Sequence, residues 1–323
     1  MHYGLPYKTK QFFTLLIKLS IVVGAGYFIV TKLTAQSDLY FSDFLKTIIQ
    51  NGILNFENLL ILLGLSLLNW SLEIYKWKAL VSFETPISWQ KSAQQSLAGL
   101  TASFITPNRL GDYGAKLAYF NASIRKRIAL LNLLGHMAQM TATTVLGLIG
   151  FIYMILKFNI DISSYKLLRG VVILATVGAL SVFGLRQNKF RIKGFSLSRI
   201  LNYIKHEMPF TLHLKTLGLS ALRYFCFSFQ LYFILMLFGA SLTPFEGFIA
   251  ITSLYFLASI VPTLAIFDVV IKSGSAIYIL SFFDISSWLV LSAMTLMYLL
   301  NFVLPGLFGS YFVLNFKLPK QDT

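Results

Sequence analysis

The stretch TPNRLGDYGAK, residues 106–116, interrupts an apolar segment and decides how this chain can fold. Its proline ends a helix, and Asp112 and Lys116 stand four residues apart, so they share one face of the helix that follows. The stretch PTLAIFDVVIK, residues 262–272, repeats the same order of proline, acid and lysine. Charges beside broken apolar helices, at matching points of two halves, are typical of the binding site in a transporter built from inverted repeats.

The rest of the chain is apolar enough to lie in lipid. Of its 323 residues 56% are hydrophobic and 12% are charged, and the mean hydropathy is +0.71. A soluble domain has about 25% charged residues, and no polar interval here reaches the roughly 50 residues of the smallest ordinary domain. The composition therefore predicts an all-α, polytopic membrane protein that forms a single integral membrane domain, residues 1–323.

Six apolar segments reach the roughly 20 helical residues that cross a bilayer. These predicted spans lie near residues 12–31, 56–75, 128–155, 168–185, 217–239 and 286–312. Two further apolar stretches, 93–120 and 247–281, contain the proline breaks, and each is long enough for two half-length helices. The sequence thus predicts eight hydrophobic elements, six full spans and two re-entrant helix pairs.

The basic residues orient these elements. The net charge of +15 would suggest nucleic acid for a soluble protein, but the lysines and arginines here stand at the ends of apolar segments. With both termini cytoplasmic, most of the 27 basic residues fall inside, as the positive-inside rule requires. The first broken stretch then enters from the cytoplasm and the second from outside. We therefore expect a cell (inner) membrane protein with an inverted repeat of residues 11–156 and 167–313.

The two motifs supply the candidate substrate-binding residues. Arg109 offers a planar fork suited to phosphate, Gly111 permits close backbone approach, and a half-helix N-terminus favours anions. The expected binding residues are Pro107, Arg109, Gly111, Asp112, Lys116, Pro262, Asp268 and Lys272. For Arg109 and Lys116 a purely structural role is the alternative, and for Asp268 and Lys272 a solvated helix end.

Four further polar residues in the predicted spans are expected to line a cavity: Glu73, His136, Gln139 and Arg223. Each has a plainer alternative. Glu73 could form a local ion pair at the interface, Arg223 could extend to the cytoplasmic surface, and the other two could join helices by hydrogen bonds.

An enzyme is not expected. The four histidines show no metal-ligand spacing, and the chain has a single cysteine, Cys226. No HExxH, GxSxG or Walker A motif occurs, so we expect neither a metal nor another cofactor. An intramembrane enzyme that acts on lipid carriers would lack a recognisable nucleophile.

Residues 106–112, together with Lys116, resemble the P-x-R-hydrophobic-G-E signature of the lysylphosphatidylglycerol synthase transmembrane-region family, with aspartate at position 112 in place of the commoner glutamate. The similarity spans roughly residues 10–313, and the glycines of the family's second motif are missing between Pro262 and Asp268. The resemblance implies a stand-alone, flippase-like protein without the aminoacyltransferase domain.

Two functions follow as hypotheses. The first is a flippase-like transporter that moves a lipid or lipid-linked anionic substrate between membrane leaflets. The second is a non-transporting membrane scaffold or accessory subunit. The expected partners are anionic or phosphate-bearing membrane lipids and not nucleic acid, and a homo-oligomer is left open.

Overall fold

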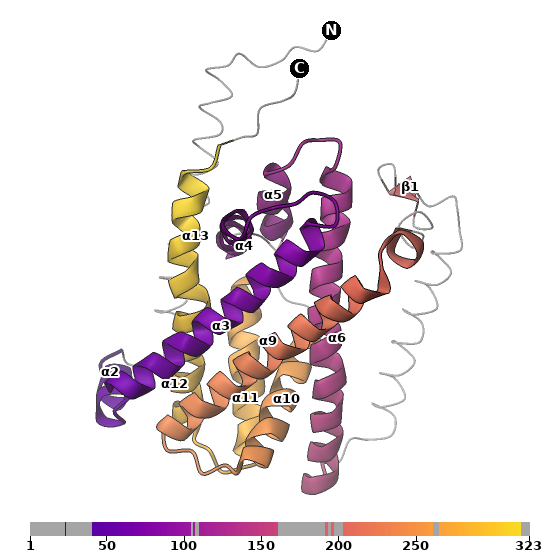
Figure 1. Ribbon diagram of the computed structural model, residues 1–323. Coiled ribbons are helices and arrows are strands. Elements are labelled where there is room, and N and C mark those ends of the chain that lie inside the picture. The colour runs from indigo at the N-terminus through magenta and orange to yellow at the C-terminus, as the bar shows by residue number, and fades with distance from the viewer. Residues whose placement is uncertain are drawn as a thin grey trace.

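The computed structural model is a bundle of long and short helices (Figure 1). It describes residues 23, 41–104, 106, 110–160, 191–192, 195–196, 203–260 and 265–317. The first half contains α2 (Phe41–Gln50), α3 (Phe56–Val81), α4 (Trp89–Phe104), α5 (Leu110–Ala118) and α6 (Arg125–Phe158). The second half contains α9 (Phe210–Leu237), α10 (Pro244–Ile260), α11 (Ala265–Ser281), α12 (Ser287–Tyr298) and α13 (Leu304–Leu314). Two π-helical segments, η2 (Tyr203–Glu207) and η3 (Leu299–Val303), complete the described helices.

Four helices are long and apolar enough to cross a membrane: α3, α6, α9 and the continuous run Ser287–Leu314, which joins α12, η3 and α13. They coincide with four of the six predicted spans, so the prediction of a helical integral membrane protein is confirmed. The predicted spans 12–31 and 168–185 lie outside the described residues.

The described chain is helical, as predicted, apart from one short antiparallel ladder. Strand β1 (Arg191–Ile192) pairs with β2 (Phe195–Ser196), Arg191 opposite Ser196. Two residues per strand are too few to produce a detectable alternation of apolar and polar side chains.

Each broken apolar stretch folds as two short helices that pack against each other, α4 with α5 and α10 with α11. The longest of them has 17 residues, or about 26 Å of helix, which is less than the thickness of the hydrocarbon layer. The two pairs lie at opposite ends of the long helices, α4 and α5 at the upper end in Figure 1 and α10 and α11 in the lower half.

Glycines on α6 allow a close approach of α10. A Cβ atom at Gly147 would collide with Phe256, and one at Gly150 would collide with the hydroxyl of Thr252. Small residues of this kind let helix backbones come close in membranes, where dispersion and hydrogen bonds drive association.

Glycines on α13 allow a similar close approach to α4. A Cβ at Gly306 would meet the ring of Phe104, and one at Gly309 would meet the carbonyl of Leu97 and the hydroxyl of Thr101. The Thr101 hydroxyl also donates a hydrogen bond to the carbonyl of Gly306 over 3.0 Å. A Gly-x-x-Gly pair therefore marks the last long helix of each half where it contacts a short helix of the other half.

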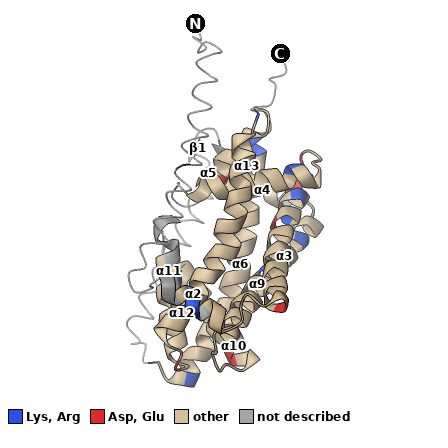
Figure 2. Cartoon of the chain, turned by 90° about the vertical axis from the view of Figure 1, so that its left-hand side faces the viewer, with Lys and Arg blue, Asp and Glu red and all other residues tan. Residues whose placement is uncertain are grey.

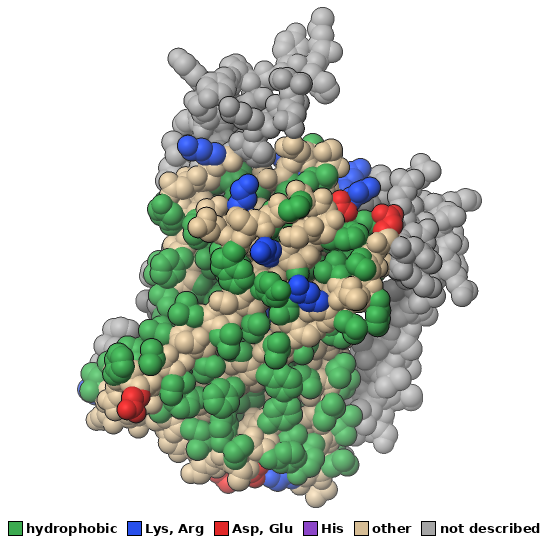
Figure 3. Space-filling view, viewed as in Figure 1, with side chains coloured by type: hydrophobic (Ala, Val, Ile, Leu, Met, Phe, Trp, Pro, Cys, Tyr) green, Lys and Arg blue, Asp and Glu red, His purple; other side chains and the backbone are tan. Residues whose placement is uncertain are grey.

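Apolar side chains cover the outside of the long helices. On α6 the exposed set includes Met140, Val145, Ile149, Ile152 and Leu156, and similar sets occur on α3, α9 and α13. Figure 3 shows hydrophobic side chains over most of the visible face below the upper end. Lysine and arginine gather toward the upper end of the described chain in Figures 2 and 3. This surface fits a lipid environment with a basic rim.

The glycine contacts generate the first prediction. Gly150→Ala and Gly309→Ala should each destabilise the protein by about 1–3 kcal/mol, because the added methyl group overpacks a tight helix contact. Denaturant unfolding of the purified protein in detergent micelles measures this.

The matched control is Gly218→Ala on α9, where the added Cβ has nothing within 4 Å. This control should be neutral or stabilising by up to about 1 kcal/mol, as alanine favours a helix over glycine. Equal effects at the three positions would show that the close contacts are not formed.

Candidate functional site

Asp112 is the centre of a buried polar cluster between α5 and α6. The Lys116 ammonium lies 3.1 Å from each of its carboxylate oxygens. The Asn132 amide donates to Asp112 Oδ2 and its carbonyl accepts from Lys116, both over 2.9 Å, and His136 Nε2 lies 2.9 Å from the same Oδ2. We call Asp112, Lys116, Asn132 and His136 the Asp112 cluster.

Local contacts between α4 and α5 fix the position of Asp112. A Cβ on Gly99 of α4 would collide with Oδ1 of Asp112, and one on Gly111 would collide with the carbonyl of Ala102. Thr106 connects the two helices, since its hydroxyl donates to the Ala102 carbonyl and accepts from the backbone N–H of Gly111 over 2.7 Å. The expected close backbone approach at Gly111 is therefore present, and it brings the carboxylate against α4.

A second polar cluster surrounds Arg223 of α9. Its guanidinium Nη1 lies 3.0 Å from Oε2 of Glu73, and its Nε donates to Oδ1 of Asn69 over 3.1 Å. The same Oε2 lies 2.8 Å from the ammonium of Lys76, whose side chain is only 3% exposed. Gln139 of α6 accepts from Arg223 over 3.5 Å. We call Glu73, Lys76, Asn69, Gln139 and Arg223 the Arg223 cluster.

Amide groups extend the Arg223 cluster toward the second half. Asn69 donates to Asn301 over 2.9 Å, and Asn301 donates to Gln230, which in turn donates to Ser66 over 2.8 Å. Asn301 lies in η3, and its backbone carbonyl accepts from the indole N–H of Trp70. A π-helical turn frees backbone carbonyls from the regular ladder, which allows this extra hydrogen bond.

One face of α6 joins the two clusters. Asn132, His136 and Gln139 stand at i, i+4 and i+7, so they point to the same side. The first two bind the Asp112 cluster, and Gln139 binds Arg223. Trp77 of α3 makes a further connection, because its ring centroid lies 4.5 Å from the Lys116 ammonium while its neighbour Lys76 pairs with Glu73.

The charges of the two clusters do not balance. Lys76, Lys116 and Arg223 are three cations, and Glu73 and Asp112 are two carboxylates, which leaves one positive charge in excess before any proton on His136. Charge–charge interactions are strong inside a protein because the effective dielectric is low. This arrangement favours a further anion close to the clusters.

The structure brings together seven of the residues singled out from the sequence: Gly111, Asp112, Lys116, Glu73, His136, Gln139 and Arg223. Lys272 lies apart on α11, where its ammonium is 5.5 Å from the ring centroid of Phe302. Pro107, Arg109 and Pro262 lie outside the described residues, and Asp268 is described only as a position in α11.

Arg223 was open to two interpretations in the sequence, and its side chain points toward other helices rather than to the end of its own. It is 21% exposed and contacts Glu73 and Asn69 of α3. The hydroxyls of Thr141 and Thr143 on α6 donate instead to carbonyls of their own helix.

Several residues of the site were not singled out from the sequence: Asn69, Asn132, Gln230, Asn301 and Trp77. For two of them, the spacing in the sequence contains a signal that could have identified them. Asn132 precedes His136 by four residues and Asn69 precedes Glu73 by four, so each shares a helix face with a residue already considered.

Comparison with protein-family models, with curated proteins and with solved structures gives no match for this chain. The contacts of the two clusters therefore carry the functional interpretation. In the described part of the chain, no three His, Cys, Asp or Glu residues are grouped so that they could hold a metal ion.

A double-mutant cycle tests whether Asp112 and Lys116 form a buried pair. Lys116→Met should destabilise the protein by about 3–5 kcal/mol, because it leaves a buried carboxylate without its cation. Adding Asp112→Asn should recover part of that loss, which gives a coupling energy above about 1.5 kcal/mol in denaturant unfolding.

The control cycle uses Lys157 and Glu246, whose charged atoms lie 2.8 Å apart but whose side chains are 34% and 29% exposed. Their coupling should be about 0.2–1 kcal/mol, as for other exposed pairs. If the Asp112–Lys116 coupling were no larger, the buried pair would not exist in the folded protein.

Proposed function

We propose that this protein is a flippase-like transporter that moves a lipid or lipid-linked anionic substrate between membrane leaflets. The observation that carries the proposal is the excess positive charge of the two clusters, held among apolar, membrane-length helices. Each charge near the centre of a bilayer costs about 2.5–3.5 kcal/mol on insertion scales, so an uncompensated cation there requires a functional reason. A phosphate group that crosses the membrane would supply the missing negative charge.

The contacts between the halves support an inverted repeat as the framework of transport. Helices α3–α6 and α9–α13 follow one order: long, short, short, long. The short helix α10 of the second half packs on α6, and the short helix α4 of the first half packs on α13. A two-fold relation between residues 11–156 and 167–313 requires this exchange, and it places the two helix pairs toward opposite membrane faces.

The charge distribution supports the orientation expected for a cell (inner) membrane. The loops at the α4–α5 end are flanked by basic residues, namely Lys78, Lys91, Arg125, Lys126 and Arg127. The described loops at the other end carry Asp284, and the helix ends beside them carry Glu57 and Glu246. Lys157 lies at this end too and pairs with Glu246. By the positive-inside rule the α4–α5 end is cytoplasmic. The resemblance of residues 106–112 to a flippase-containing family points to the same function.

One observation favours the alternative, a scaffold or accessory subunit without transport. The Asp112 carboxylate is bonded to Lys116, Asn132 and His136 of its own chain, as in a network that only joins helices. Lipid movement separates the two functions, because a transporter should accelerate the exchange of anionic lipid between leaflets and a scaffold should not.

Arg223→Gln is the variant that tests transport. It removes the excess charge but leaves Glu73 paired with Lys76, so the fold should be kept. In liposomes with fluorescent phosphatidylglycerol, we expect the wild-type protein to accelerate exchange between leaflets, measured by quenching of the outer leaflet with dithionite. Arg223→Gln should slow this exchange about tenfold or more, because a charge-assisted hydrogen bond to phosphate is lost.

Two variants make the result specific. Arg223→Lys keeps the charge and should retain more activity than the glutamine variant, although it loses the planar fork. Lys157→Gln removes an exposed lysine distant from both clusters and should behave as wild type. Protein that inserts correctly but accelerates no lipid of a broad anionic panel would favour the scaffold instead.

A further inference from the structure

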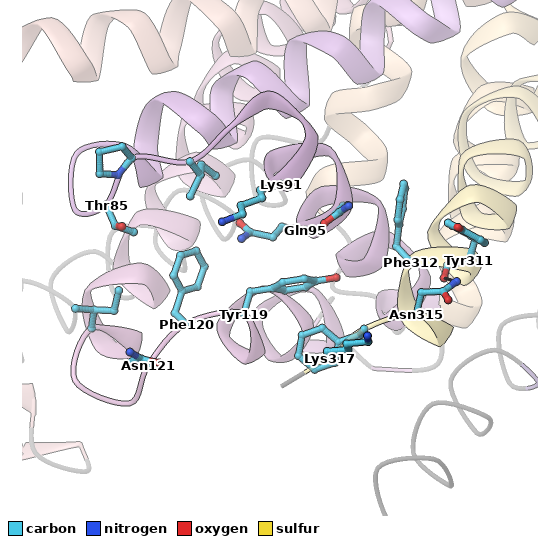
Figure 4. A pocket seen from close by; sticks show the side chains of 15 residues that line it. Thr85, Lys91, Gln95, Tyr119, Phe120, Asn121, Tyr311, Phe312, Asn315 and Lys317 are labelled. Carbon is cyan, nitrogen blue, oxygen red and sulfur yellow. Dashed lines mark hydrogen bonds between the residues drawn. The ribbon is translucent and has the colours of Figure 1, made fainter. Parts of the chain in front are cut away.

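A cavity of about 570 Å³ lies at the α4–α5 end of the molecule (Figure 4). Its walls come from the α3–α4 loop, the first turns of α4, the segment after α5 and the end of α13. None of the charged residues of the two clusters lines it, so it is a separate space.

The lining combines two lysines and several hydrogen-bonding groups with apolar side chains. Lys91 enters from α4 and Lys317 from beyond α13, and among the described residues that line the cavity none is acidic. Gln95 and Asn315 add amide groups, and Figure 4 shows Tyr119 extending between the walls. Burial raises the pKa of Tyr119 to about 12, so its phenol stays protonated and remains a donor at neutral pH. These groups suit an anion with several acceptor oxygens, such as a phosphate ester.

A short chain of contacts connects the cavity to the buried clusters. Gln95 lines the cavity and accepts a 2.7 Å hydrogen bond from the indole N–H of Trp77. Trp77 also contacts Lys116, whose ammonium lies over the Trp77 ring. A ligand in the cavity is therefore separated from Lys116 by the side chains of Gln95 and Trp77.

An apolar ridge runs along α13 away from the cavity. Leu307, Tyr311 and Leu314 stand at i, i+4 and i+7 on one helix face, and they are 61%, 64% and 43% exposed in the described chain. Tyr311 also lines the cavity. A cavity that contains two cations thus continues into an apolar helix surface, which matches an amphiphile better than a small soluble anion.

We propose that this cavity binds the phosphate headgroup of an anionic membrane lipid, whose acyl chains lie along the Leu307–Leu314 face of α13. The proposal rests on the transport function above, and it identifies where the substrate headgroup docks before it reaches Lys116 and Arg223. Trp77 and Gln95 are then the side chains that must move for the headgroup to pass from the cavity to the clusters.

Protection of a single cysteine from labelling tests the headgroup site. The only native cysteine, Cys226, is buried, and Cys226→Ser keeps a donor toward the Leu65 carbonyl. In that background, Asn315→Cys places a thiol in the cavity lining, and Gln90→Cys places one on an exposed position at the same end but outside the cavity. The full-length protein in nanodiscs is labelled with a water-soluble maleimide.

Phosphatidylglycerol nanodiscs should slow labelling at position 315 about fivefold relative to phosphatidylcholine nanodiscs, and leave position 90 unchanged. Lys91→Ala combined with Lys317→Ala should remove this protection, whereas Lys215→Ala, an exposed lysine over Tyr75, should not. Glycerol 3-phosphate or inorganic phosphate, added to phosphatidylcholine nanodiscs, should protect neither position.

Equal labelling in both lipids, or equal protection at both positions, would overturn the proposal. Protection at position 315 by glycerol 3-phosphate or inorganic phosphate in phosphatidylcholine nanodiscs would also overturn it, because the site would then belong to a soluble phosphate. The outcome is independent of lipid movement. Exchange between leaflets without protection would contradict only the headgroup site, and protection without exchange would contradict only transport.

Discussion

The hydrogen bonds from one face of α6 hold the charged interior of this protein together. Asn132 and His136 bind the Asp112 carboxylate that α5 presents, and Gln139 binds the Arg223 guanidinium from α9. Asp112 also pairs with Lys116, and Arg223 pairs with Glu73, but without the α6 partners each ion pair would lose hydrogen bonds that offset the cost of burying charge in an apolar bundle. The relative positions of α3, α5 and α9 around α6 are constrained by this need.

The packing of the apolar helices makes that arrangement possible. In lipid, apolar burial does not drive helices together, so association depends on close contact and on interhelical hydrogen bonds. The Gly-x-x-Gly pairs of α6 and α13 provide the close contact. The chain of Asn69, Asn301 and Gln230 provides interhelical hydrogen bonds. The result is a closely packed frame that holds a net positive charge among apolar helices.

Much of the framework could be predicted from the sequence, because it depends on properties of single segments. The length of the apolar segments predicted the four long helices, and the proline breaks at Pro107 and Pro262 predicted the paired short helices. The four-residue spacing of Asp112 and Lys116 predicted their pairing. Contacts between helices could not be predicted in this way: the partnership of Asn132 with both, or of Asn69 with Arg223, depends on how separate helices are rotated and packed. The two motifs have different surroundings, since Lys272 lies against the ring of Phe302 whereas Lys116 pairs with Asp112.

The proposed route for an anionic amphiphile combines the excess positive charge of the two clusters, the cavity with Lys91 and Lys317, and the apolar ridge on α13. Electron cryo-microscopy in nanodiscs that contain either phosphatidylglycerol or phosphatidylcholine tests this most directly. The account predicts phosphate density about 3 Å from the side chain of Lys116 or Arg223 in the anionic lipid alone. Density absent from both maps, with each cation bonded only to groups of its own chain, would contradict it.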